Sequence, residues 1–122
     1  MKNSLNWFEI PVTDFERAKK FYSEIFDFKM PSTQVMGYDM AFFDMEKGGV
    51  GGAIVYGEGY FPSHKGSLVY LNAQPDLQIV LDRVEKSGGH ILVPKTLIDD
   101  ALGYFAFITD TEGNKVALHS MA

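Results

Sequence analysis

Two side chains near opposite ends of the sequence could take part in chemistry, the carboxylate of Glu9 and the imidazole of His119. Glu9 stands in the run Trp7-Phe8-Glu9-Ile10, where burying a carboxylate without a partner or a purpose is costly. An imidazole titrates near neutral pH and can accept or donate a proton there. Glu9 and His119 are therefore candidates to bind a polar substrate or to act as acid and base.

Each of these two residues also has a purely structural interpretation. Glu9 could pair with a nearby hydroxyl group, and His119, three residues from the last residue, could do no more than satisfy its own hydrogen bonds. We favour a functional role for Glu9 because of its apolar neighbours. For His119 both interpretations stay open.

The composition excludes several other kinds of site. The 122 residues include no cysteine, which rules out disulfides, thiolate ligands and cysteine nucleophiles. The net charge is -5 and the longest basic cluster is Lys19-Lys20, so we expect no nucleic acid and no membrane as a partner. No phosphate-binding glycine loop, His-Glu-x-x-His motif or Ser-His-Asp arrangement supports a hydrolase or nucleotide site. Because there is no long apolar stretch, we expect a soluble cytoplasmic protein.

The first half of the chain reads as strand, helix, strand, strand, strand. Thr13 and Glu16 have the spacing of a capping box at the start of the helix. The apolar residues of that helix recur at helical spacing and form one face: Phe15, Ala18, Phe21, Tyr22, Ile25 and Phe26. We expect the strands at residues 5–12, 29–35, 38–44 and 50–56.

After a linker at residues 57–66 the same order repeats. Pro75 fits the first position of a helix with the apolar face Leu77, Val80, Leu81 and Val84, ended by Gly88-Gly89. The strands are expected at residues 67–72, 90–93, 103–109 and 115–120, with a loop from Pro94 to Leu102 that could cover a binding site. Residues 37–44 align over residues 103–110, with Gly, Tyr and Asp coinciding.

The repeat predicts one α+β domain at residues 1–122 with two tandem βαβββ modules. Module one covers about residues 5–56 and module two about residues 67–120, joined by the linker. A half of this size covers only one face of its sheet with a helix, so the two halves are expected to share their bare faces. The result would be a curved mixed sheet around a cup, with the helices outside and a pocket for a small molecule inside.

Two motifs resemble a known superfamily. The segment Trp7-Phe8-Glu9-Ile10-Pro11-Val12-Thr13-Asp14-Phe15, continued by Ala18, Phe21 and Tyr22, is similar to the opening strand and helix of the glyoxalase, bleomycin-resistance and extradiol-dioxygenase (vicinal oxygen chelate) superfamily. The segment Asp110-Thr111-Glu112-Gly113-Asn114 resembles the signature before that family's last strand. The likeness runs from about residue 5 to residue 120 and implies the same fold of paired βαβββ modules.

The resemblance also locates four positions where metal-bearing relatives carry His, Glu or Gln. In this sequence they are Trp7, Ala53, Ser67 and Ala117. Of these four side chains only the serine hydroxyl has a lone pair to offer, and it is a weak ligand, so we expect no metal and no other cofactor. Trp7 could instead stack on a planar ligand or fill the space of the missing ion.

We therefore expect a metal-independent protein that binds a small amphipathic molecule in its cup. The predicted pocket residues are Trp7, Glu9, Ala53, Ser67, Ala117 and His119. A second hypothesis is an enzyme of the lyase, isomerase or dioxygenase type that uses Glu9 and His119, or a divergent metal site. A third is an interaction module whose cup is packed shut by aromatic side chains. The resemblance implies a homodimer, and exchange of strands between chains stays open.

Overall fold

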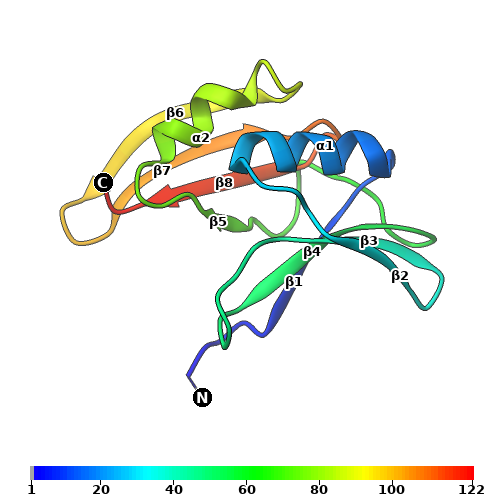
Figure 1. The fold of residues 1–122 in the computed structure, drawn as a ribbon. Helices are drawn as coiled ribbons and strands as arrows, with labels where there is room; N and C mark the ends of the chain where they lie inside the picture. Colours follow the sequence, from blue (N-terminus) through cyan, green and yellow to red (C-terminus); the bar gives the residue numbers. More distant parts are fainter. Residues whose placement is uncertain (1) are drawn as a thin grey trace.

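The elements βαβββ occur twice along the chain (Figure 1). The structure is a computed structural model and describes residues 2–122. The first module contains β1 (Trp7–Pro11), α1 (Phe15–Phe26), β2 (Ser32–Val35), β3 (Tyr38–Phe42) and β4 (Gly51–Tyr56). The second contains β5 (Tyr70–Asn72), α2 (Leu77–Val84), β6 (His90–Asp99), β7 (Gly103–Thr109) and β8 (Lys115–Ser120). The predicted α+β fold of two tandem modules is confirmed.

Each module makes its own four-stranded mixed sheet. The strand orders are β1-β4-β3-β2 and β5-β8-β7-β6, so the two sheets have the same topology. In each sheet the first and last strands of the module pair in parallel, and the other pairs are antiparallel. A parallel pair needs a long connection, and here the helix and the two intervening strands supply it.

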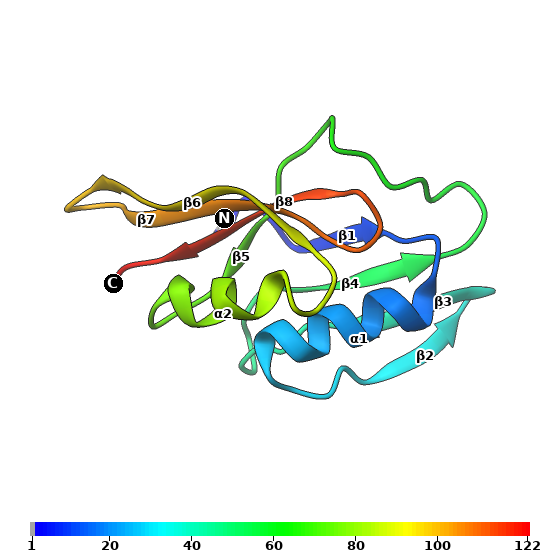
Figure 2. The ribbon, with the colours of Figure 1, turned by 90° about the horizontal axis from the view of Figure 1, so that it is seen from above.

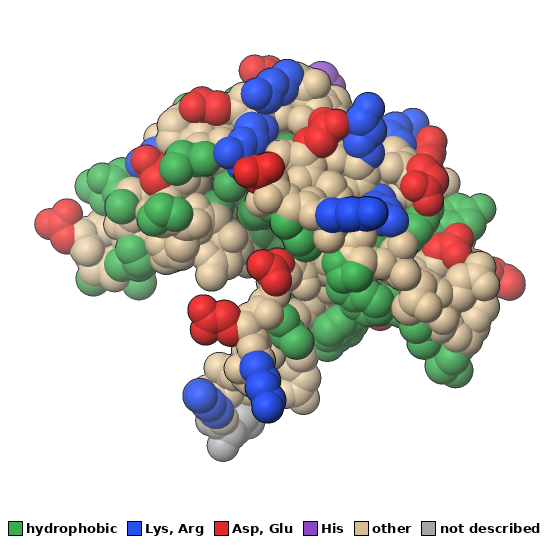
Figure 3. Space-filling view, viewed as in Figure 1, with side chains coloured by type: hydrophobic (Ala, Val, Ile, Leu, Met, Phe, Trp, Pro, Cys, Tyr) green, Lys and Arg blue, Asp and Glu red, His purple; other side chains and the backbone are tan. Residues whose placement is uncertain are grey.

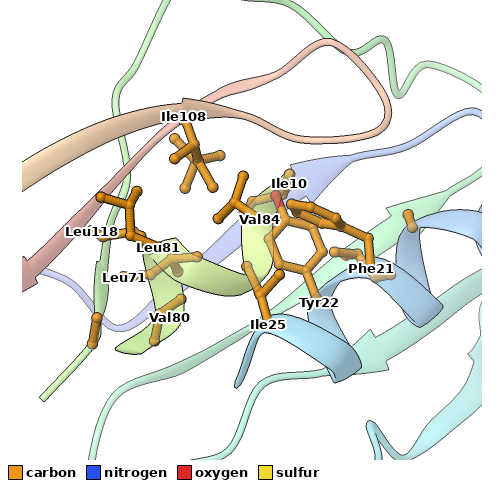
Figure 4. Packing of buried hydrophobic residues seen from close by; sticks show 14 of the residues in the cluster. Ile10, Phe21, Tyr22, Ile25, Leu71, Val80, Leu81, Val84, Ile108 and Leu118 are labelled. Carbon is orange, nitrogen blue, oxygen red and sulfur yellow. The ribbon is translucent and has the colours of Figure 1, made fainter. Parts of the chain in front are cut away.

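The helices of the two modules lie side by side on one face of the sheets (Figure 2). Their apolar faces and the inner faces of both sheets build one continuous core, seen closely in Figure 4. The predicted helix faces are buried as expected: Ala18, Phe21, Tyr22 and Ile25 in α1, and Leu77, Val80, Leu81 and Val84 in α2. No helix within residues 2–122 is long and apolar enough to cross a membrane.

The amino terminus of α1 differs from the predicted capping box. Asp14 is the N-cap residue, and its side chain accepts a hydrogen bond from the Arg17 amide. The Thr13 and Asp14 amides instead donate to Glu112 Oε1, at 3.0 and 2.7 Å, although Glu112 belongs to the other module. A carboxylate at a helix amino terminus also interacts favourably with the helix dipole and so stabilises the helix. The acid that caps α1 is thus Glu112 of the β7–β8 turn. The spacing of residues around one helix cannot predict a cap that comes from the other module.

Two predictions for the second module are wrong. Helix α2 begins at Leu77 after the N-cap Asp76, so Pro75 lies outside it. The expected ending at Gly88-Gly89 is observed: Gly88 has a φ of 105°, and the Gly88 and Gly89 amides donate to the Glu85 and Val84 carbonyls in the turn that follows Val84. The expected loop after Pro94 is a continuation of β6 to Asp99, with irregular pairing to β7. Proline is tolerated there because β6 is an edge strand interrupted by bulges.

The strand pairing also shifts the internal alignment by one residue. Ala53 in β4 and Ala117 in β8 stand at matching metal positions of the family. Ala53 pairs with Phe42 and Ala117 pairs with Phe107, so Phe42 and Phe107 are the equivalent residues of the two modules. The sequence alignment had set Phe42 over Ile108. A slip of one residue exchanges the two faces of a strand, so only the observed pairing identifies the matching side chains.

Candidate binding site

The candidate site lies on what we call the open face, the surface of both sheets that is turned away from the helices. In β1 the side chains alternate: Ile10 joins the core, whereas Trp7 and Glu9 point to the open face. The pairing of Glu9 with Ala53 and of Tyr70 with Ala117 places both alanines on the same face. Glu9 is exposed there, so its expected burial is wrong.

The carboxylate of Glu9 is held by two neighbours. Tyr60 Oη donates to Glu9 Oε1 at 2.5 Å, and the Trp7 indole Nε1 donates to Glu9 Oε2 at 3.3 Å. The hydrogen bond to Glu9 is the main cause of a raised pKa of Tyr60, with partial desolvation adding to it. The Tyr60 ring packs edge-on against Tyr38, with 5.3 Å between centroids. Both carboxylate oxygens are therefore oriented before any ligand arrives.

Aromatic rings gather on the open face of each sheet. Trp7 lies 6.1 Å from Phe42 in the first sheet, measured between ring centroids. In the second sheet Phe107 contacts Phe105 at 5.0 Å and Tyr70 at 6.4 Å. Figure 3, which looks from the side of the helices, shows that the outline of the molecule is hollowed between the second sheet and the amino-terminal segment. The open face thus offers flat apolar surfaces beside a fixed carboxylate.

A pocket of about 210 Å³ opens between β1, the linker and the start of β8. Its charged and polar lining residues are Glu9, Ser63, Lys65, Ser67, Asn114 and Lys115. Its apolar lining residues are Ile10, Pro11, Phe61, Val69 and Val116. Asn114 fixes the linker because its Oδ1 accepts from the Ser63 amide at 3.0 Å, while its Nδ2 donates to the Pro11 carbonyl at 2.7 Å.

The structure brings together only some of the predicted pocket residues. Glu9 and Ser67 line the pocket, and Trp7 adjoins it through its hydrogen bond to Glu9. His119 lies on β8 of the other sheet, where its Nε2 is 2.6 Å from the Leu102 carbonyl oxygen and no hydrogen bond joins it to Glu9. Ala53 and Ala117 are fully covered, one in each sheet.

Tyr60 was missed because the linker has no periodic pattern that assigns its side chains to a face. Two other polar residues of the linker, His64 and Lys65, are exposed. Lys95 bonds to Asp76 at 2.8 Å, which lowers the pKa of that carboxyl group, and its Nζ stands 4.5 Å from the Tyr104 ring centre. Lys95 is thus engaged beside α2 and does not meet a ligand on the open face.

The residues at the family's metal positions do not fit a metal ion. By strand pairing, Tyr70 takes the place of Glu9, so Leu68, two residues earlier, matches Trp7 and Ser67 is one residue out of place. The four side chains are then two apolar methyl groups, an indole and an isobutyl group, and none has an oxygen or imidazole lone pair. Within residues 2–122 no cluster of three or more His, Asp or Glu side chains could hold a metal.

Similar proteins agree with this architecture. Residues 4–118 match the family described as the Glyoxalase/Bleomycin resistance protein/Dioxygenase superfamily. "Putative glyoxylase CFP32" of Mycobacterium tuberculosis is 34% identical over 119 residues, which are 93% of this chain and 44% of that protein. A "Glyoxylase-like domain-containing protein" of Didymella fabae is 30% identical over 123 residues, covering 97% of this chain and 94% of the relative. The chain thus spans less than half of the mycobacterial protein.

Solved structures show the same fold at low sequence identity. A glyoxalase/bleomycin resistance protein from Albidiferax ferrireducens superposes with a TM-score of 0.75 at 20% identity, covering 95% of this chain and 97% of the other. A glyoxalase I mutant from Zea mays gives 0.73 at 21% identity, covering 97% of this chain and 45% of the other. Because the family match covers residues 4–118, the chain belongs to the glyoxalase, bleomycin resistance protein and dioxygenase superfamily.

Proposed function

We propose that this protein binds a small amphipathic molecule on its open face without the metal used by catalytic members of its superfamily. The observation that carries the proposal is the Glu9 carboxylate, fixed by Tyr60 and Trp7 beside exposed aromatic rings. A fixed polar group next to flat apolar surfaces can orient a ligand that has one polar and one apolar end. Because both donors are already in place, little ordering is needed when the ligand binds.

The chemistry of the available side chains supports binding without a metal. Trp7, Ala53, Leu68 and Ala117 provide no ligand atoms for a divalent ion at the positions where relatives carry them. Metal analysis of the purified protein tests this part of the proposal. We expect no bound transition metal; a stoichiometric amount of Ni, Zn, Fe or Mn would overturn it.

The second candidate function is an enzyme, for which the short bond between Tyr60 and Glu9 is the specific support. The phenol keeps its proton and orients the Glu9 carboxylate, and Glu9 would be the base that takes a proton from a substrate. The structure does not support Glu9 and His119 as a pair. Glu9 lies on β1 of the first sheet and bonds to Tyr60, whereas His119 lies on β8 of the second sheet and bonds to the Leu102 carbonyl. A turnover that is lost in Glu9→Gln would favour this candidate over simple binding.

Trp7 provides a direct test because it is the single tryptophan of the chain and touches the proposed site. Four probes share a phenyl group and differ in charge: phenylalanine, phenethylamine, hydrocinnamate and phenethyl alcohol. For ligands of this size we expect a saturable change in Trp7 fluorescence, with a Kd of about 1 mM or tighter for at least one probe. Failure of all four to change the fluorescence would overturn the proposed function.

The role of Glu9 is tested with a matched pair of variants. Glu9→Gln keeps the size of the side chain and removes its charge, so a probe that uses the carboxylate should bind about tenfold more weakly. Glu16→Gln makes the same change at an exposed position on α1, on the opposite side of the sheet. The control should bind each probe as the unmodified protein does.

We also propose that the protein forms a homodimer that covers part of its exposed apolar surface. Met36 is 93% exposed and Leu102 is 56% exposed, and β2 and β6 are edge strands with one side unpaired. A stable dimer buries about 1,200–2,000 Å² in total, which would cover such groups. Light scattering should give twice the chain mass of 13.7 kDa. A particle of single mass at every concentration would contradict the dimer.

A further inference from the structure

We propose that the pocket between β1, the linker and β8 binds a small zwitterion, a molecule that carries a cationic group and a carboxylate on a short apolar body. This inference rests on the proposed function and specifies its ligand class. The charges that line the pocket support it, because they are of both signs and stand on different walls.

The negative wall is Glu9 on β1, and the positive groups are Lys65 in the linker and Lys115 at the start of β8. None of the ion pairs formed within residues 2–122 includes any of these three side chains. Opposite charges that face one pocket without pairing leave room for a ligand that meets both. A ligand with matching charges would replace the water around them with direct charge-assisted bonds.

Two of the charges are also held in place. Tyr60 and Trp7 orient the Glu9 carboxylate, as described above. Lys115 Nζ stands 4.5 Å from the centre of the Phe107 ring, which favours the ammonium group over that face. The ligand thus meets a fixed anion and a positioned cation, and Lys65 provides a second cation from the more exposed linker.

The remaining lining sets the size and the shape of the ligand. Phe61, Val69 and Pro11 give apolar contacts for a short body, and the Ser67 hydroxyl offers a hydrogen bond. The volume of about 210 Å³ lies below the roughly 300–1,000 Å³ of pockets for drug-sized ligands. A molecule of about the size of one amino acid is therefore a better match than a large drug.

A ligand with a single charge fits less well. A pure cation would gain from Glu9 and be repelled by the two lysines, whereas a pure anion would gain from the lysines and be repelled by Glu9. The four phenyl probes separate these cases because their apolar bodies are alike. We expect phenylalanine to bind about tenfold or more tightly than phenethylamine, hydrocinnamate or phenethyl alcohol, as measured by Trp7 fluorescence.

The outcomes separate the inference from the proposed function on which it rests. If phenethylamine or hydrocinnamate binds as tightly as phenylalanine, the zwitterion inference fails while binding of an amphipathic molecule stands. If phenethyl alcohol binds tightest, the charges do not select the ligand and the inference also fails. If no probe binds, both proposals fail.

Charge-removing variants test which group each end of the ligand meets. Glu9→Gln should weaken phenylalanine about tenfold and leave hydrocinnamate unchanged or tighter, because the repulsion of its carboxylate is gone. The double variant Lys65→Gln/Lys115→Gln should weaken phenylalanine similarly and leave phenethylamine unchanged or tighter. Lys47→Gln, in the exposed turn before β4 and outside the pocket, is the matched control.

The crossed pattern of gains and losses is the decisive readout. A variant that simply misfolds would weaken every probe alike, and urea unfolding of each variant checks this separately. If both changes weaken all charged probes equally in folded protein, the two ends of the ligand do not meet separate walls and the inference is wrong.

Discussion

Arg17 Nε lies 2.7 Å from Glu112 Oε2 and joins α1 of the first module to the β7–β8 turn of the second, across 95 residues of sequence. Glu112 is fully covered on its side chain, whereas Arg17 is half exposed. The same carboxylate accepts from the Thr13 and Asp14 amides and from the Thr111 hydroxyl. One side chain thereby couples the stability of the two modules.

The Glu112 carboxylate should make the free energy of unfolding fall at acid pH. Desolvation raises the pKa of Glu112, but the hydrogen bonds from Arg17, Asp14, Thr111 and Thr13 outweigh it and lower the pKa from 4.5 to about 2. Since the folded pKa is depressed, the stabilisation is present above pH 4.5 and is lost as the pH falls towards 2. Glu112→Gln should remove up to about 3 kcal/mol at pH 7 and flatten the loss between these values.

Urea unfolding at a series of pH values measures this effect. Burial raises the pKa of Asp110, so that group changes stability in the opposite sense, but it is present in both proteins and cancels in their difference. Glu16→Gln, the same change at an exposed site, should follow the unmodified protein. Parallel curves for Glu112→Gln and the unmodified protein would contradict the assignment.

The phenol of Tyr22 makes a second contact between the modules. Its Oη donates to Asp110 Oδ2 at 2.7 Å in the buried core, and burial raises the pKa of Tyr22 well above its usual value. Tyr22→Phe keeps the ring and removes the donor, so the free energy of unfolding should fall by about 1–3 kcal/mol. Tyr70→Phe, at a phenol on the open face, should change it by less than about 0.5 kcal/mol. Equal losses in the two variants would refute a special role for the Tyr22 bond.

The side-chain amide of Asn114 should be required for stability, and a carboxylate should not replace it. Its Nδ2 donates to the Pro11 carbonyl and to Asp110 Oδ2, at 2.7 and 2.9 Å. Asn114→Asp removes both donors and sets a carboxylate against Asp110, so we expect a loss of about 3 kcal/mol at pH 7. Burial and the mutual repulsion both raise the pKa of such a pair, so protonation relieves the repulsion and the deficit relative to the unmodified protein should shrink as the pH falls from 7, beginning above the ordinary Asp pKa of about 4. A deficit that does not change with pH would show that repulsion is not its cause.

The sequence predicted the elements better than the contacts between them. Alternation along β1 was enough to put Trp7 and Glu9 on the face opposite Ile10, because a strand has a strict period of two. The end of β6 was predicted too early, at Val93, because a proline such as Pro94 usually breaks a strand. An edge strand with bulges accepts this proline, since no paired amide is lost there.

Contacts made by the linker and the turns were beyond sequence patterns. The bond from Tyr60 to Glu9 joins a segment without periodicity to a strand 51 residues away. The capping of α1 by Glu112 likewise depends on how the two modules pack. Such contacts are set by tertiary packing, and no local spacing of residue types encodes them.

His119 is predicted to be structural, although its place on the open face had made it a candidate acid or base. Its Nε2 donates to the Leu102 carbonyl oxygen at 2.6 Å and so ties β8 to the hairpin between β6 and β7. His119→Ala should lower the free energy of unfolding by about 1 kcal/mol, because one partly exposed hydrogen bond is lost. Binding of phenylalanine should change by less than about twofold, since the pocket lining does not include His119. A tenfold weaker binding in His119→Ala, with folding intact, would return the imidazole to the ligand site and reopen the acid and base role beside Glu9.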